Sequence, residues 1–204
     1  IELGLVGSEM CIRDSSNPLN ERLSNEDKED EEEKPLAERS RNSRSPMLSF
    51  SNTDMAFSGN VMVAGSYHGF NIYNLDNQGH AELVSSVICP GGQGDVSIVG
   101  NLLIMSVEQN RGRIDCGLQG AGTEPNPERF RGIRIFDISD LKRPQQVGAV
   151  QTCRGSHTHS VVSGPDENGI IIVYNSGTSS VRDQEELESC FEAIPGDNRT
   201  ALFR

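Results

Sequence analysis

An internal repeat is the feature that most constrains how this chain can fold. The segment Asp54-Met-Ala-Phe-Ser-Gly-Asn60 aligns with Asp95-Val-Ser-Ile-Val-Gly-Asn101, 41 residues later. The segment Gly69-Phe-Asn-Ile-Tyr-Asn-Leu75 aligns with Gly132-Ile-Arg-Ile-Phe-Asp-Ile138, 63 residues later. A third unit begins with His159-Ser-Val-Val-Ser163. The second unit therefore carries an insertion between its second and third strands, where the sequence is rich in Gly, Pro and Arg.

Alternating apolar and polar residues predict four short strands in each of the first two units. Gly59-Asn60 and Gly100-Asn101 suit the tight turns of β-hairpins, because both residue types tolerate a positive φ angle. We expect strands at 53–58, 61–66, 70–75, 82–87, 95–99, 102–107, 133–138 and 146–151. In the third unit, a turn at 166–169 predicts a hairpin whose second strand covers 169–174.

Four antiparallel strands that recur about every 40 residues are typical of β-propeller blades. The sequence therefore predicts an all-β chain, a β-propeller fragment of about three four-stranded antiparallel blades. We expect these blades at 53–88, 94–151 and 157–204. A β-sandwich with chance self-similarity is the alternative.

The ends of the chain differ from this repeat. Residues 1–15 resemble translated sequencing-adapter read-through, so they and Cys11 are excluded from the fold. We expect residues 16–50 to be disordered, because residues 21–34 hold eight acids and an Arg/Ser-rich linker follows. We expect residues 51–204 to form a partial propeller. Residues 201–204 end inside an expected strand, which predicts that this propeller is truncated at its C-terminus.

Charge and hydropathy argue against a nucleic-acid partner and against a membrane-spanning helix. The formal net charge is -12, and an acidic surface repels phosphate, so we expect no nucleic-acid partner. No apolar run approaches the about 20 residues of a membrane-spanning helix, so we expect no transmembrane segment in this chain.

The second unit also carries a recognisable motif. Ile133-Arg-Ile-Phe-Asp-Ile-Ser-Asp140, followed by Pro144 and Val147-Gly148, resembles the LVIVD repeat of secreted bacterial β-propellers. Cys89-Pro-Gly-Gly-Gln-Gly-Asp95 and Thr152-Cys-Arg-Gly-Ser-His-Thr-His159 resemble segments of one LVIVD-containing group. The likeness covers about 53–204 and is looser in the first unit, where Asn74 replaces the aspartate. The resemblance implies a propeller that is secreted, periplasmic or on the cell surface, and it implies no catalytic residues.

The motif also has a physical interpretation without the family. On an extended strand, alternate side chains point to opposite faces. Ile133, Ile135 and Asp137 therefore share one face, and the other face holds Arg134, Phe136 and Ile138. We expect apolar cover on both faces and a structural role for the polar residues Asp137, Ser139 and Asp140, which can bind backbone N–H groups at the turn.

Four cysteines remain for pairing, and all fall in two types of loop. Cys89 and Cys153 precede the first strand of a unit, 64 residues apart, while Cys116 and Cys190 lie in insertions after a second strand. A metal cluster is disfavoured because no CxxC spacing exists. Four cysteines allow three pairings. If the units share one design, the pairs are Cys89–Cys116 and Cys153–Cys190.

Two histidines form the candidate metal site. His157 and His159 would point the same way on an extended strand and could bind one Zn or Cu ion. The candidate third ligands are His68, Asp54 and Asp95. The alternative is that these histidines bind loop carbonyls.

The sequence thus supports two hypotheses from different classes. The first is a non-catalytic extracytoplasmic β-propeller that needs no cofactor and binds a protein or glycan through its insertion-rich face. The alternative is a metal-dependent propeller enzyme, such as an oxidoreductase, that uses Zn or Cu on His157 and His159.

Overall fold

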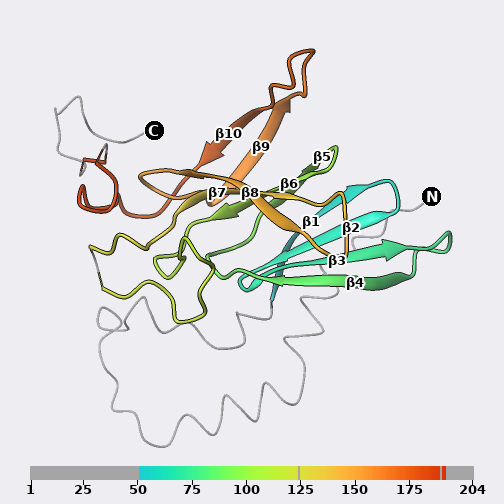
Figure 1. Ribbon diagram of the computed structural model, residues 1–204, viewed down its shortest axis with the longest axis horizontal. Coiled ribbons are helices and arrows are strands. Elements are labelled where there is room, and N and C mark those ends of the chain that lie inside the picture. Colours follow the sequence, from blue (N-terminus) through green and yellow to red (C-terminus); the bar gives the residue numbers. More distant parts are fainter. Residues whose placement is uncertain (1–50, 124, 189, 192–204) are drawn as a thin grey trace, which may run out of the picture. The chain divides into compact units, whose positions relative to one another are not determined.

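The computed structural model describes residues 51–123, 125–188 and 190–191 (Figure 1). These residues form two four-stranded antiparallel sheets and one two-stranded antiparallel sheet, without a closed ring among them. In this part of the chain no helix has the length and apolar character needed to cross a membrane. The expected linker at 16–50, the excluded residues 1–15 and the expected strand at 201–204 lie outside the described residues.

The first sheet is a meander of strands in chain order. It contains β1 (Asn52–Ser58), β2 (Val61–Ser66), β3 (Gly69–Leu75) and β4 (Ala81–Ile88). The second sheet repeats this order with β5 (Val96–Val99), β6 (Leu102–Val107), β7 (Gly132–Asp137) and β8 (Gln145–Gln151). All eight strands lie within one residue of the bounds that the sequence predicts.

Glycine sets both tight hairpin turns. Gly59 and Gly100 have φ angles of 58° and 59°, the left-handed region that glycine adopts without steric cost. The flanking pairs Ser58–Val61 and Val99–Leu102 close two-residue loops. The turn chemistry predicted from the sequence is therefore confirmed.

The third sheet differs from the prediction. It has two described strands, β9 (Thr158–Ser163) and β10 (Ile172–Ser176), and β10 begins three residues later than expected. Asp166 is the reason, because its Oδ1 accepts hydrogen bonds from Asn168 N and Ile170 N, both at 2.8 Å. These bonds keep residues 167–170 in a turn and delay the strand.

The sheets lie side by side through their first strands. β1 contacts β5, and β5 contacts β9 (Figure 1). The main core lies between the first two sheets, where Phe70 meets Phe136 edge to face with ring centroids 5.0 Å apart. Val63, Ile72 and Leu103 in the same core are fully buried.

The LVIVD-like segment behaves as its alternation predicts. Ile133, Phe136 and Ile138 are buried, so both faces of β7 have apolar cover. Asp137 Oδ1 accepts from Ser139 N at 2.8 Å, and this bond lowers the pKa of Asp137. Asp140 Oδ1 accepts from Lys142 N at 3.0 Å in the following turn. The aspartates thus shape the turn that leaves the strand.

Core packing at Phe136 yields the first prediction. Phe136→Ala should lower the free energy of unfolding by about 3–5 kcal/mol, because it leaves a cavity against Phe70. Val147→Ala is the control, since Val147 is 58% exposed and its loss should change stability by less than about 0.5 kcal/mol. Urea denaturation measures both, and equal values for the two variants would contradict this account of the core.

Candidate functional site

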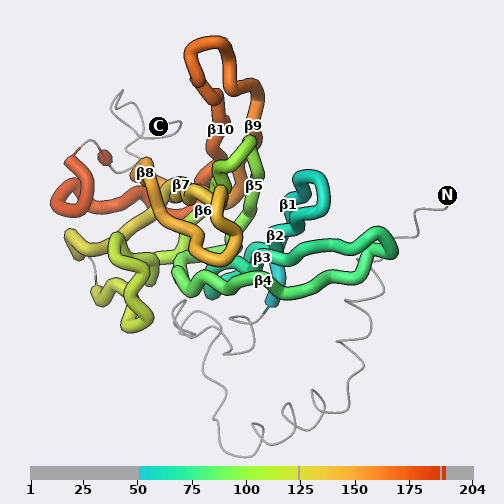
Figure 2. Tube along the Cα trace, turned by 45° about the vertical axis from the view of Figure 1, so that its right-hand side comes forward, coloured from blue at the N-terminus to red at the C-terminus, as the bar shows by residue number. Residues whose placement is uncertain are grey.

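Two long connections form the most distinctive surface of the chain. The first insertion, residues 108–131, joins β6 to β7, and the second, residues 177–191, follows β10. The tube view shows these yellow-green and red segments as neighbours (Figure 2). We call their described residues the insertion platform.

Each insertion is tied to the loop that precedes its own sheet. Cys89 and Cys116, 27 positions apart in sequence, form one disulfide, and Cys153 and Cys190, 37 positions apart, form the other. These are the two pairs that the repeat predicts. Disulfides persist in oxidising compartments, so they indicate an extracytoplasmic environment.

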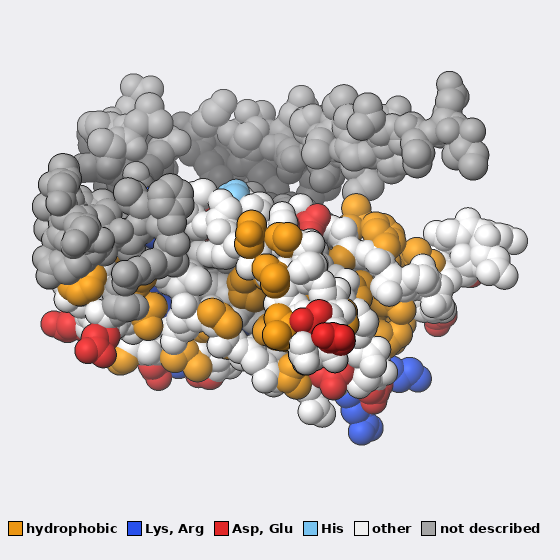
Figure 3. Space-filling view, turned by 90° about the horizontal axis from the view of Figure 1, so that it is seen from above, with side chains coloured by type: hydrophobic (Ala, Val, Ile, Leu, Met, Phe, Trp, Pro, Cys, Tyr) orange, Lys and Arg blue, Asp and Glu red, His pale blue; other side chains and the backbone are white. Residues whose placement is uncertain are grey.

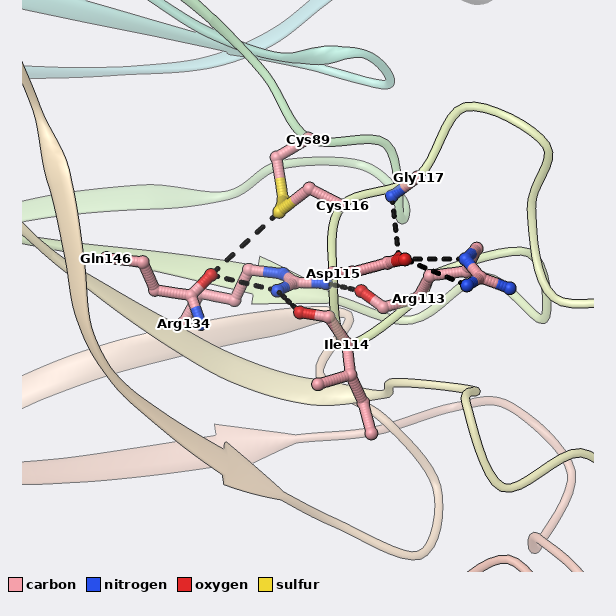
Figure 4. The surroundings of a disulfide bond; sticks show 8 residues. All are labelled: Cys89, Arg113, Ile114, Asp115, Cys116, Gly117, Arg134 and Gln146. Carbon is pink, nitrogen blue, oxygen red and sulfur yellow. Dashed lines mark hydrogen bonds and ion pairs between the residues drawn. A yellow bond between two sulfur atoms is a disulfide. The ribbon is translucent and has the colours of Figure 1, made fainter.

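A buried arginine organises the surroundings of the first disulfide (Figure 4). Arg134 donates to Gln146 Oε1 at 2.9 Å, to Ile114 O at 3.3 Å and to Arg113 O. Its guanidinium also lies 4.2 Å from the centre of the Phe130 ring, a cation–π contact. Burial lowers the pKa of Arg134 to about 10. Arg134 thus fixes the insertion backbone to the second sheet.

A second arginine closes the first insertion at its surface. Arg113 donates to Asp115 at 2.8 Å and to Glu128 at 2.6 Å. The hydrogen bond from Arg113 holds the pKa of Asp115 well below its usual range, and Gly117 N donates to the same carboxylate. These ion pairs join the two ends of the loop, although both carboxylates are largely exposed.

Glu186 joins the two insertions. Its Oε1 accepts from Arg129 Nε at 2.7 Å and from Asn126 N at 2.8 Å, while its Oε2 accepts from Arg182 Nε at 3.0 Å. The three charged side chains are almost fully buried. Burial alone would raise the pKa of Glu186, but the hydrogen bond from Arg129 and the further bonds lower it below its ordinary value.

Further arginine contacts extend this connection. Arg182 donates to Arg129 O at 2.8 Å, and Arg131 donates to Ser179 Oγ and Ser180 O, both at 2.9 Å. Arg154 donates to Ser179 O at 2.9 Å. The insertions of neighbouring sheets therefore form one hydrogen-bonded body. In the described residues of the first insertion, the β-pairing is limited to an isolated bridge between Arg113 and Arg129.

The platform exposes apolar side chains among acids. Ile114 is 49% exposed and Leu118 is 62% exposed, on either side of Cys116. Asp115 and Glu128 lie at the surface beside them. The arrangement offers a pre-organised surface with apolar contacts and an acidic border.

The two candidate metal-binding histidines lie in separate hydrogen-bonded pairs. His157 Nδ1 is 2.6 Å from Glu108 Oε2, and Glu108 Oε1 accepts from Thr178 N and Oγ1 at 2.7 Å. Burial alone would raise the pKa of Glu108, but the hydrogen bonds from Thr178 and His157 lower it. Glu108 thus ties the start of the first insertion to His157 and to the start of the second insertion.

His159 forms the second pair, and its side chain is more deeply buried than that of His157. His159 Nδ1 lies 2.8 Å from both Asp95 Oδ2 and Ser106 Oγ, and Ser106 Oγ lies 2.7 Å from Ser156 Oγ. Burial alone would raise the pKa of Asp95, but the hydrogen bonds from His159 lower it. Because carboxylate and hydroxyl share one ring nitrogen, the group lacks the geometry of a Ser-His-Asp relay, in which they bind opposite nitrogens.

The three candidate third ligands of the predicted metal site have different surroundings. Asp95 lies against His159 as a hydrogen-bond partner, whereas Asp54 Oδ2 accepts from Val96 N at 3.0 Å and His68 N donates to Ser66 Oγ at 3.2 Å. Across residues 51–123, 125–188 and 190–191, no group of three or more His, Cys, Asp or Glu side chains is placed to hold a metal ion.

Sequence reasoning missed the arginine network and the buried serines. The available signal was the Arg-rich composition of 110–131, which indicates a loop but not its acceptors. Ser106 and Ser156 carry no local signal, because they bind each other across 50 residues of sequence.

Comparison with known proteins adds no family assignment: family models, curated proteins and solved structures were all searched, and none matches this chain.

Glu186 supplies a prediction with a defined pH dependence. Glu186→Gln should lower the free energy of unfolding by about 3–5 kcal/mol at pH 7, because it leaves buried Arg129 and Arg182 without their carboxylate. The folded pKa lies below the unfolded value of about 4.3, so the carboxylate stabilises above that pH. This contribution is lost as the pH falls through the folded pKa.

The difference between wild type and Glu186→Gln should therefore narrow as the pH falls from 5 toward 2. Guanidinium denaturation across this range measures it. Glu185→Gln, at an exposed neighbouring position, is the control and should change stability by less than about 0.5 kcal/mol. A Glu186 variant that matches this control at pH 7 would show that the platform does not depend on the buried pair.

The disulfides give a separate prediction. Replacing Cys89 and Cys116 together by serine should lower the free energy of unfolding by about 3–4 kcal/mol, since a 27-residue loop is no longer closed. A reductant should then destabilise the double variant less than the wild type. Peptide mapping without reductant should recover the two pairs seen here, and recovery of Cys89 joined to Cys153 would be inconsistent with them.

Proposed function

We propose that this chain is an extracytoplasmic β-propeller protein of the LVIVD-repeat type, with the three sheets as its blades. The support is architectural. Each complete sheet is a four-stranded antiparallel meander, and its first strand lies beside the first strand of the next sheet. Propeller blades have this strand order around a central axis. The two disulfides favour a protein that is secreted, periplasmic or on the cell surface.

The proposed activity is non-catalytic binding of a protein partner at the insertion platform. The observation that carries it is the connection through Glu186, which joins insertions from two sheets into one body. A surface that is already ordered loses little conformational entropy on association, so its contacts contribute more to affinity. Two disulfides and a buried ion network around loops without strands are consistent with selection for a fixed surface.

The side chains on this surface favour a protein over a glycan. Ile114 and Leu118 are exposed apolar groups, and buried apolar groups form the centre of protein interfaces. The exposed carboxylates of Asp115 and Glu128 would form a polar rim that favours a basic partner surface. The buried charged groups of Glu186, Arg129 and Arg182 bind one another, which favours binding over catalysis at the platform.

Photo-crosslinking in cells that export the protein tests this function. A photoreactive amino acid at position 114 or 118 should capture one discrete protein, and the same probe at Val147, exposed on β8, should not. Glu128→Gln with Asp115→Asn should weaken the capture, because these changes remove the acidic border. Equal capture at 114 and 147 would reject the platform as the site.

A glycan array separates the other class of partner. If the platform binds a protein, any signal on the glycan array should be the same for the wild type and for Leu118→Asp. A glycan signal that disappears in Leu118→Asp, together with no protein capture, would replace the protein partner by a glycan at the same surface.

A further inference from the structure

The two disulfides differ in how far their cysteines are buried. Cys153 and Cys190 are 2% and 0% exposed and pack among apolar side chains. Cys89 is also fully buried, but Cys116 is partly exposed at the border of the main core. A thiolate must reach a sulfur atom to break a disulfide, so the accessibility of Cys116 favours exchange at the first disulfide over the second.

The backbone of Cys116 has an unfavourable conformation. Its φ angle is 58°, and among the described residues no other residue except glycine has a positive φ. A side chain disfavours this left-handed region, so the surrounding structure must hold the residue there. Cys116 N donates to Arg113 O at 3.3 Å, so a turn and the disulfide share this task. Breaking the S–S bond removes one of the two constraints, and backbone relaxation therefore favours the reduced form.

Chain entropy affects the two disulfides almost equally. They close loops of similar length, 27 and 37 positions, and the entropic cost of closure grows only with the logarithm of the length. A difference in how easily they are reduced must therefore come from their surroundings.

Arg134 brings a positive charge close to the first disulfide (Figure 4). Its side chain is fully buried, its hydrogen bonds go to neutral oxygens, and within the described residues its Nε–H has no acceptor. Gln146 Oε1 accepts from Arg134 at 2.9 Å and lies 3.9 Å from Cys116 Sγ, so one amide oxygen separates the guanidinium from the sulfur. A cationic group beside a cysteine stabilises its thiolate.

The charge of Arg134 has little compensation around it. Asp115 attracts it from a distance, but Arg113 binds the Asp115 carboxylate at 2.8 Å. On the face in Figure 3, acidic side chains are spread over the surface and basic ones gather mainly at one corner, because several arginines lie inside the protein. Reduction of the first disulfide would give the buried guanidinium a thiolate as its partner.

The second disulfide has different electrostatic surroundings. Arg182 N donates to Cys153 O at 2.9 Å, but the guanidinium of Arg182 is neutralised by Glu186. Buried apolar surroundings disfavour a thiolate. The local charges therefore favour reduction at Cys89–Cys116 and oppose it at Cys153–Cys190.

Reduction also creates a hydrogen bond at Cys116. A disulfide sulfur has no proton, so in the oxidised protein the sulfur can only contact Gln146 Oε1. A thiol at Cys116 can donate to this oxygen, because an amide oxygen can accept two donors and Arg134 supplies only one.

We propose that the Cys89–Cys116 disulfide is a reversible redox site, which a dithiol reductant opens while Cys153–Cys190 stays closed. A thiolate of the reductant attacks the Cys116 sulfur, the S–S bond breaks, and Cys89 leaves as a thiolate that takes up a proton. The second thiol of the reductant then attacks the mixed disulfide as a thiolate and releases Cys116. The reductant becomes a disulfide, and two electrons and two protons pass to the two cysteines.

Opening this bond would loosen the exposed apolar pair of the insertion platform. Cys116 lies between Ile114 and Leu118, and the disulfide ties this part of the loop to the chain before the second sheet. Arg134 still holds two carbonyls of the loop, so the platform should become more mobile around Cys116 without unfolding. The redox site would in this way regulate the partner surface, a consequence that rests on the proposed function.

A redox titration of the full 204-residue chain tests the site. The protein carries Cys11→Ser, so that four cysteines remain, and is equilibrated with dithiothreitol at graded ratios of oxidised to reduced reagent. Alkylation and peptide mass spectrometry then report each pair. Cys89–Cys116 should be half reduced at a ratio about tenfold or more above that for Cys153–Cys190, a difference of about 30 mV or more. The second disulfide is thus an internal control.

Gln146→Glu tests the role of Arg134 while leaving the buried side chains in place. Gln146 is exposed, and a carboxylate there would pair with Arg134 and repel a thiolate at Cys116. In this variant, half reduction of the first disulfide should need a ratio about tenfold or more below that of the wild type. Gln78→Glu, the same change at an exposed turn of the first sheet, is the matched control and should leave both ratios unchanged.

Hydrogen exchange measures the structural consequence. At a ratio that opens the first disulfide alone, the amides of residues 113–118 should exchange about tenfold or more faster, and those of 182–187 should keep their rates. Unchanged exchange at 113–118 would overturn the regulation of the platform.

Two further results would overturn the redox site itself. They are a wild type in which Cys153–Cys190 opens first or together with Cys89–Cys116, and a Gln146→Glu variant that titrates like the wild type. These measurements need no partner. A failure of partner capture at positions 114 and 118 in the oxidised protein would reject the proposed function and leave the titration result as it stands.

Discussion

The buried positive charge of the arginine side chains is the constraint on which the two insertions depend. Arg129, Arg131, Arg134 and Arg182 are all buried, and an arginine in a protein cannot release its proton to escape the cost of burial. Each guanidinium must therefore find acceptors. Glu186 neutralises two of them, and backbone carbonyls of the insertions accept many of the remaining N–H groups. The described residues of the loops have almost no strand partners for these carbonyls, so the arginines supply donors to several of them.

A repeated aspartate relates the sheets to one another. Asp54 in the first strand of the first sheet accepts from Val96 N at 3.0 Å, and Asp95 in the second sheet accepts from His159 N at 2.7 Å. In both cases a carboxylate before or within one first strand binds the backbone of the next first strand. The same type of bond therefore joins the first sheet to the second and the second sheet to the third. It also explains why Asp95 serves the junction of sheets and not a site open to solvent.

Strands and turns could be predicted because their causes are local. The alternation of 61–66 and 102–107 and the glycines at 59 and 100 act within a few residues, and the structure reproduces them. The start of β10 could not be predicted from alternation, because the side chain of Asp166 competes for the backbone N–H groups of the turn. The hydrogen-bond partners of the histidines could not be predicted for a similar reason. Their partners Glu108 and Asp95 lie 49 and 64 residues away in sequence, so spacing on β9 alone could not reveal them.

The sequence by itself determined the all-β class, the strands of two sheets, the turn glycines and the pairing of four cysteines. These follow from a period of two, from residues that tolerate special backbone angles and from an offset that recurs along the chain. Only the tertiary structure decided which charges meet, since Arg129 and Glu186 belong to different insertions and are joined by burial. It also decided which sheet faces remain exposed. That choice depends on which neighbour lies against each face, and no single strand carries this information.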